Sequence, residues 1–108
     1  MDRELIAILR GVTPFEVVAI AEELILSGIT KIEVPLNSPN AYESIESLAN
    51  RFSSEAVIGA GTVLKKNEVS SVCNAGGKMI VSPNVNADVI IETKKLKMRS
   101  YPGVFTAS

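Results

Sequence analysis

Glu33 is the side chain in this sequence best suited to acid–base chemistry. It lies in a short apolar stretch between Ile32 and Val34. An ionised carboxylate is costly there unless a cation pairs with it or it has a chemical task. Burial raises the pKa of a carboxyl group and a nearby cation lowers it, and that balance suits proton transfer near neutral pH. The alternative interpretation is structural, namely a strand-end ion pair with an arginine such as Arg10.

Two further polar side chains end or follow apolar stretches and could bind a polar or anionic ligand. Arg10 closes the apolar run at 5–9 just before Gly11. A guanidinium in that place can hold a carboxylate or phosphate through two hydrogen bonds, although an ordinary surface arginine is the alternative. Asn37 follows the Glu33 stretch and can hydrogen-bond a substrate, but Asn-Ser-Pro is also a common sequence at the start of a helix.

The glycine-rich stretch at 59–62 follows neither of the common nucleotide-binding patterns. For Gly59 the missing side chain predicts close packing between neighbouring elements. For Gly61 and Thr62, a backbone that approaches a ligand with one hydroxyl beside it is an equal alternative to packing. Pro83 follows another apolar stretch, where it can shape the floor of a pocket or present a carbonyl group.

The composition restricts both the chemistry and the partners. The 108 residues contain no histidine and one cysteine, so we expect no metal site and no internal disulfide, and we assign no cofactor. The 11 basic and 12 acidic residues nearly balance, which gives no basis for binding nucleic acid or an anionic membrane. The apolar runs are too short to cross a bilayer and no signal peptide is visible. We therefore expect a soluble cytoplasmic protein.

Short apolar stretches alternate with amphipathic ones along the chain. We predict strands that begin near residues 5, 31, 56, 79 and 98, and helices over about 13–27, 38–52, 67–75 and 87–96. The pairs Thr13-Pro14 and Ser38-Pro39 predict that a capping side chain and a proline begin the first two helices. The fifth strand is expected to end at Tyr101, followed by a loop at 102–105 and a helix cap at Thr106.

Five strands alternating with four helices predict an α/β fold with an all-parallel sheet. The length of 108 residues favours a single domain over 1–108. Two architectures fit, the N-terminal half of a TIM (β/α)8 barrel or a small open doubly wound sheet. Both place functional residues beyond the C-terminal ends of the strands, and the polar and glycine residues described above follow the predicted strands.

Five stretches at these strand ends, taken together and in order, carry a resemblance that covers essentially the whole chain. They are LIAILRG (5–11), KIEVPLNSP (31–39), VIGAGTVLK (57–65), IVSPN (80–84) and YPGVFTAS (101–108). With them, the chain resembles the 2-keto-3-deoxy-6-phosphogluconate and 6-phosphogalactonate aldolases.

The resemblance implies a class I aldolase on a (β/α)8 barrel. Such an enzyme cleaves a phosphorylated 2-keto-3-deoxy sugar acid to pyruvate and glyceraldehyde 3-phosphate through a lysine Schiff base, and the family commonly forms homotrimers. The resemblance further implies that Glu33 moves protons, that Arg10 engages the substrate, and that Thr62 and Pro83 line the pyruvate end of the pocket. Asn37 stands in a PLNS run like that of the phosphogalactonate branch, so we expect that substrate, with phosphogluconate as the alternative.

The Schiff-base lysine of this family lies on the sixth strand, whereas these 108 residues reach the fifth. We therefore interpret the chain as the N-terminal half of such an enzyme and expect these residues alone to be inactive. Two alternatives remain open. One is a different phosphate-substrate barrel, such as an isomerase or epimerase with Glu33 as the base, and the other is an inactive truncated module.

Overall fold

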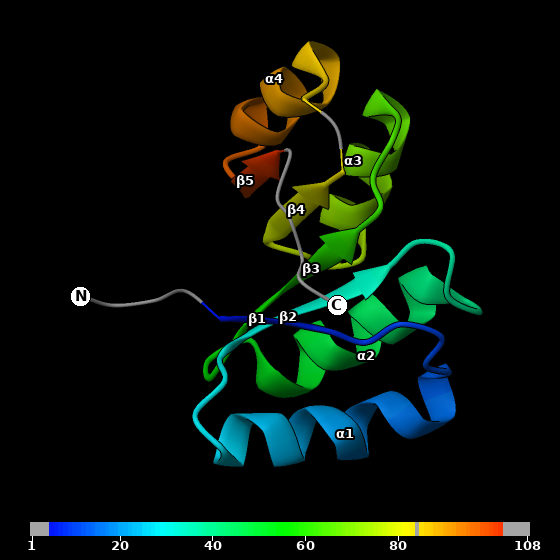
Figure 1. Ribbon diagram of the computed structural model, residues 1–108, viewed down its shortest axis with the longest axis vertical. Coiled ribbons are helices and arrows are strands. Elements are labelled where there is room, and N and C mark those ends of the chain that lie inside the picture. Colours follow the sequence, from blue (N-terminus) through cyan, green and yellow to red (C-terminus); the bar gives the residue numbers. More distant parts are fainter. Residues whose placement is uncertain (1–4, 84, 103–108) are drawn as a thin grey trace.

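The computed structural model describes residues 5–83 and 85–102. Strands and helices alternate along this part of the chain (Figure 1). The strands are β1 (Ile6–Ile8), β2 (Lys31–Pro35), β3 (Val57–Gly61), β4 (Met79–Ser82) and β5 (Arg99–Pro102). The helices are α1 (Pro14–Leu26), α2 (Ala41–Phe52), α3 (Lys66–Asn74) and α4 (Ala87–Lys95). The predicted all-parallel α/β fold with five strands and four helices is confirmed.

The strands form one sheet in the order β1-β2-β3-β4-β5, and every neighbouring pair is parallel. Right-handed crossovers between successive neighbours place all the helices on the same face. Accordingly α1 packs on α2, α2 on α3, and α3 on α4. A doubly wound sheet would reverse its strand order and carry helices on both faces, so the barrel-type arrangement is the one observed.

The residues of β2 show how the two faces of the sheet differ. Ile32 and Val34 are fully buried and belong to the apolar core between the sheet and the helices. Glu33 and Pro35 alternate with them and therefore point to the opposite face. In a closed barrel that opposite face is the interior. Among the described residues, β1 pairs only with β2 and β5 only with β4, so both edges of the sheet are open.

The first helix begins and ends as its sequence predicts. The backbone N–H of Thr13 donates to the Glu16 carboxylate at 3.0 Å, and Pro14 occupies the first helical position. Gly28 has a φ of +94°, and its left-handed conformation ends the helix. These local signals fix where the chain leaves β1 and where it returns to β2.

The predicted start of the second helix is wrong. Ser38 does not cap it, because α2 begins at Ala41 after Asn40, which has a left-handed φ of 49°. The Ser38 hydroxyl instead accepts a hydrogen bond from the backbone N–H of Gly11 at 3.2 Å, and Ser38 is buried. A contact between two loops that are far apart in sequence has replaced the local cap, and the helix starts one turn later.

The fifth strand is displaced by one residue from its predicted position. It spans Arg99–Pro102, so Pro102 pairs with Ser82 rather than opening a loop. Proline is acceptable at a strand on the edge of a sheet. The predicted loop at 103–105 and the cap at Thr106 lie outside the described residues. Within the residues that are described, no helix combines the length and apolar character needed to span a membrane.

Candidate functional site

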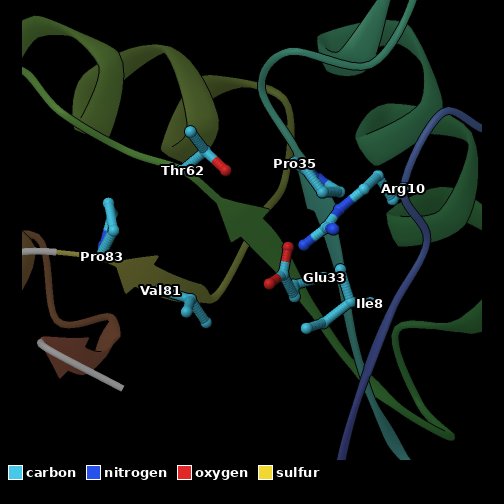
Figure 2. A pocket seen from close by; sticks show the side chains of 7 residues that line it. All are labelled: Ile8, Arg10, Glu33, Pro35, Thr62, Val81 and Pro83. Carbon is cyan, nitrogen blue, oxygen red and sulfur yellow. The ribbon is translucent and has the colours of Figure 1, made fainter. Parts of the chain in front are cut away.

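A small pocket of about 130 Å³ opens at the C-terminal ends of β1 to β4 (Figure 2). Figure 2 shows Arg10 and Glu33 on the side of β1 and β2, and Thr62 and Pro83 on the side of β3 and β4. Seven residues line it: Ile8, Arg10, Glu33, Pro35, Thr62, Val81 and Pro83. Four of the six site residues expected from sequence therefore meet in one pocket.

Glu33 is positioned by the register of β2. Its Cα pairs with Ile8 in β1 and with Gly59 in β3, and its carbonyl accepts from the Leu9 N–H at 3.0 Å. The residue is only 3% exposed, and its Oε2 atom finds no hydrogen-bond partner among the described residues. An unsatisfied buried carboxylate oxygen is costly, so this group is available for a ligand or a proton.

The electrostatics of the pocket hold Glu33 near its titration point at neutral pH. Burial raises the pKa of the Glu33 carboxyl, and the positive charge of Arg10 partly opposes that effect, leaving the pKa at about 7 instead of 4.5. In Figure 2 the Arg10 guanidinium points toward the Glu33 carboxylate. These are the two opposing influences expected from sequence, and a carboxyl with this pKa can both accept and donate a proton.

Arg10 lies in the turn that connects β1 to α1. Gly11 beside it has a φ of +74°, a conformation that glycine adopts without strain. The hydrogen bond from Gly11 to Ser38 ties this turn to the loop after β2. The backbone that carries Arg10 is thereby fixed against the strand that carries Glu33.

Thr62 follows β3 in a left-handed conformation with a φ of 56°. This region is strained for a β-branched residue and is concentrated at functional sites. Figure 2 shows the Thr62 hydroxyl directed toward the pocket, across from Arg10. The strain is consistent with a backbone held in place so that the hydroxyl faces a ligand.

Two of the expected site residues do not line the pocket. Asn37 is exposed in the loop after β2 and is absent from the pocket lining. Gly61 is also absent from the pocket lining, and the Glu33 carboxylate occupies the space beside it. Gly59 lies directly against the backbone of Met79 in β4, in keeping with the packing role expected for it.

The sequence reasoning did not single out the apolar lining of the pocket. Ile8, Pro35 and Val81 lie on the same face of the sheet as Glu33. The signal was present in the chain, because side chains two residues apart on a strand share a face. Using it required the register between strands, which places Ile8 directly opposite Glu33.

The described residues that line the pocket include one carboxylate, one guanidinium and one hydroxyl, and no amine. This set can bind a small anion and move a proton. A covalent imine would need a lysine from elsewhere in the protein.

Comparisons with known proteins agree with this arrangement. The family model for KDPG and KHG aldolase matches residues 2–108. A probable 2-dehydro-3-deoxy-6-phosphogalactonate aldolase of Rhizobium meliloti is 45% identical over 106 residues, which are 98% of this chain and 50% of that protein. The 2-dehydro-3-deoxy-6-phosphogalactonate aldolase of Escherichia coli K12 is 41% identical over 104 residues, which are 96% of this chain and 51% of that protein.

Solved structures show the same fold. A structure described as native KDPGal aligns with a TM-score of 0.90 at 39% identity and covers 99% of this chain and 53% of its own. A KDPG aldolase from Legionella pneumophila, with pyruvate captured as a covalent carbinolamine intermediate, aligns with a TM-score of 0.84 at 31% identity, over 95% of this chain and 50% of its own. The chain spans about half the length of the curated relatives it matches. Its sequence and its fold together establish that the chain belongs to the KDPG and KHG aldolase family.

Proposed function

We propose that the protein containing this chain is a class I aldolase in which Glu33 transfers protons. It would cleave a phosphorylated 2-keto-3-deoxy sugar acid to pyruvate and glyceraldehyde 3-phosphate. The observation that carries the proposal is the buried Glu33 carboxyl, with a pKa of about 7, in a pocket at the C-terminal ends of the strands. Carbon–carbon cleavage next to an imine needs a group that exchanges protons near neutral pH, and this carboxyl meets that requirement.

The remaining pocket residues have roles that follow from their chemistry. Arg10 would hold the carboxylate of the substrate, because a guanidinium binds a carboxylate through two parallel hydrogen bonds. Thr62 and Pro83 would contact the pyruvate portion of the substrate. Figure 2 shows both residues on the side of the pocket opposite Arg10. Asn37 and Gly61 complete the proposed substrate-binding set, Asn37 from the loop after β2.

Phosphogalactonate is the proposed substrate and phosphogluconate the alternative. The two relatives at 45% and 41% identity are named for 2-dehydro-3-deoxy-6-phosphogalactonate. A 2-dehydro-3-deoxy-phosphogluconate aldolase of Zymomonas mobilis is 36% identical over 89 residues. The PLNS run around Asn37 points in the same direction.

The covalent step would use a lysine that these 108 residues do not supply. The relatives are about twice as long as this chain, and a Schiff base to pyruvate agrees with the covalent carbinolamine of the Legionella pneumophila enzyme. We propose that residues 1–108 form a single domain, the N-terminal half of a (β/α)8 barrel. We further propose that the complete enzyme is a cytoplasmic homotrimer.

The second candidate is an inactive barrel module, and one observation favours it for the 108 residues alone. No lysine is among the described residues that line the pocket. A cleavage assay on the 108-residue polypeptide tests this candidate, which predicts no activity. A third hypothesis for the same pocket is a different enzyme with a phosphorylated substrate, an isomerase or epimerase that uses Glu33 as its base.

The experiment that tests the aldolase is borohydride trapping on the product of the whole reading frame that contains these codons. Pyruvate and borohydride should leave one covalent adduct on a lysine, detected by mass spectrometry, and Glu33→Gln should lower turnover by about 10² or more. An isomerase or epimerase would give no adduct. Turnover of Glu33→Gln within a few-fold of wild type would exclude Glu33 from the mechanism.

A further inference from the structure

Gly61 is the last residue of β3, and its backbone conformation does not require a glycine. The described glycines with left-handed φ values are Gly11, Gly28 and Gly76, and Gly61 is not among them. Gly61 pairs with Pro35 of β2, and its carbonyl accepts from the Leu36 N–H at 2.9 Å. A residue with a side chain could adopt this extended backbone, so the reason for the glycine has to be space.

The space beside Gly61 is filled by the Glu33 carboxylate. A β-carbon added to Gly61 would overlap both carboxylate oxygens and the Cδ atom of Glu33, which are its three nearest neighbours. Glu33 pairs across the sheet with Gly59, two residues earlier in β3. Its side chain therefore leans along the sheet toward the C-terminal ends of the strands and lies over Gly61.

The two glycines of β3 consequently have different partners. A β-carbon on Gly59 would overlap the backbone carbonyl and the Cβ atom of Met79 in β4, so Gly59 permits close strand packing. A β-carbon on Gly61 would meet the reactive group of the pocket. Of the two glycines, Gly61 is the one that lies beside the Glu33 carboxylate.

We propose that Gly61 is a positioning residue, whose missing side chain leaves the slot that holds the Glu33 carboxylate against β3 and facing the pocket. The catalytic part of this inference rests on the proposed role of Glu33, but the geometric part does not. The slot explains how Glu33, a residue that is only 3% exposed, fits its carboxylate beside a strand without displacing that strand.

Gly61→Ala is expected to force the carboxylate out of the slot into the open part of the pocket. The group would then regain water, and the pKa of Glu33 would fall from about 7 toward its ordinary value of 4.5. A carbon-13 NMR titration of the Glu33 side chain reports this directly in the product of the whole reading frame. We expect a decrease of about one pH unit or more, and an unchanged titration midpoint would overturn the proposal.

A double-mutant cycle provides the second measurement and a matched control. Gly61→Ala should destabilise the protein when residue 33 is glutamate and have much less effect in the Glu33→Ala background, where no carboxylate is present to collide. Denaturant unfolding of the four proteins measures both effects. If Gly61→Ala does not fold, the double variant Gly61→Ala/Glu33→Ala tests the proposal, because it should be as stable as Glu33→Ala alone. Equal destabilisation in both backgrounds would overturn the proposal.

Neither measurement requires aldolase activity, so the two proposals fail separately. If the wild type shows neither cleavage nor an imine adduct, the proposed function is refuted, but the proposal that Gly61 positions the Glu33 carboxylate is unaffected. In an active enzyme, Gly61→Ala should lower kcat by about 10² or more with KM within a few-fold. Adding Glu33→Asp, which shortens the side chain by one methylene, should restore part of the lost kcat.

Discussion

The burial of Glu33 predicts that the protein is less stable above neutral pH than it would be with a neutral residue at this position. The pKa of Glu33 is about 7 in the folded protein against 4.5 ordinarily. Between these values the folded protein retains a proton that the unfolded chain has lost. Stability therefore falls as the pH rises through this window and levels off above the folded pKa.

The size of the effect follows from the same two values. One pH unit of difference corresponds to about 1.4 kcal/mol, so the ionised carboxylate costs the folded protein roughly 3 kcal/mol above about pH 8. Glu33→Gln keeps the shape of the protonated side chain and removes its ionisation. The stability of the variant relative to wild type should therefore increase by roughly 3 kcal/mol between about pH 4.5 and pH 8.5.

Urea unfolding of wild type and Glu33→Gln at several pH values measures this difference. All other titrating groups are shared by the two proteins, so their contributions cancel. Glu55→Gln is a matched control, because Glu55 is exposed in the turn after α2 and the same substitution there removes a carboxylate that is not buried. An increase below about 1 kcal/mol for Glu33→Gln would refute the argument that burial sets the pKa. Arg10→Met tests the second cause, because losing the cation should raise the folded pKa of Glu33 and so extend the window at its upper end.

Three further variants test other features of the structure. Thr62→Gly should raise the free energy of unfolding by about 1 kcal/mol, because glycine adopts the left-handed backbone without strain, and it should lower kcat/KM because the hydroxyl is lost from the pocket. Denaturant unfolding and activity assays measure the two effects, and a loss of stability would show that the Thr62 backbone is not strained. Ser38→Ala should lower the free energy of unfolding by about 1 kcal/mol and raise KM, because the turn that carries Arg10 loses its hydrogen bond to Ser38. An unchanged KM would show that this hydrogen bond does not position Arg10. Ser44→Ala in α2 should stabilise the protein by about 1 kcal/mol, because the buried Ser44 hydroxyl has no hydrogen-bond partner among the described residues. Thermal unfolding measures this, and a destabilised variant would contradict the argument by showing that the hydroxyl makes a stabilising hydrogen bond.

The sequence predicted best where the signal is local. Helix α1 begins after the cap at Thr13, with Pro14 as its first residue, and ends just before Gly28. In α2 the spacing of the apolar residues is likewise a local signal: Ile45 and Leu48, three residues apart, share one helix face and are fully buried. Signals of this kind depend on residues within one or two turns of each other, which is why they can be read without coordinates.

The features that the sequence could not predict depend on contacts between distant residues. Ser38 has the residue type of a helix cap, but its hydroxyl accepts from Gly11, which is 27 positions away in the chain. For Gly61, the sequence left ligand approach and packing as equal alternatives, and only the structure shows the Glu33 carboxylate beside it. Asn37 follows a strand and is exposed, and it is not among the residues that line the pocket; its contact with substrate stays a prediction.

The amino-acid order by itself determined that strands and helices alternate, that Glu33 lies within a strand, and that the candidate residues follow strand ends. Tertiary structure alone decided that Glu33 shares a face with Ile8, that its carboxylate rests on Gly61, and that Arg10 points toward it. The physical reason is that the pKa and the position of a buried charge depend on desolvation and on neighbouring charges. Both are set by the register between strands, which brings together residues that lie far apart in the sequence.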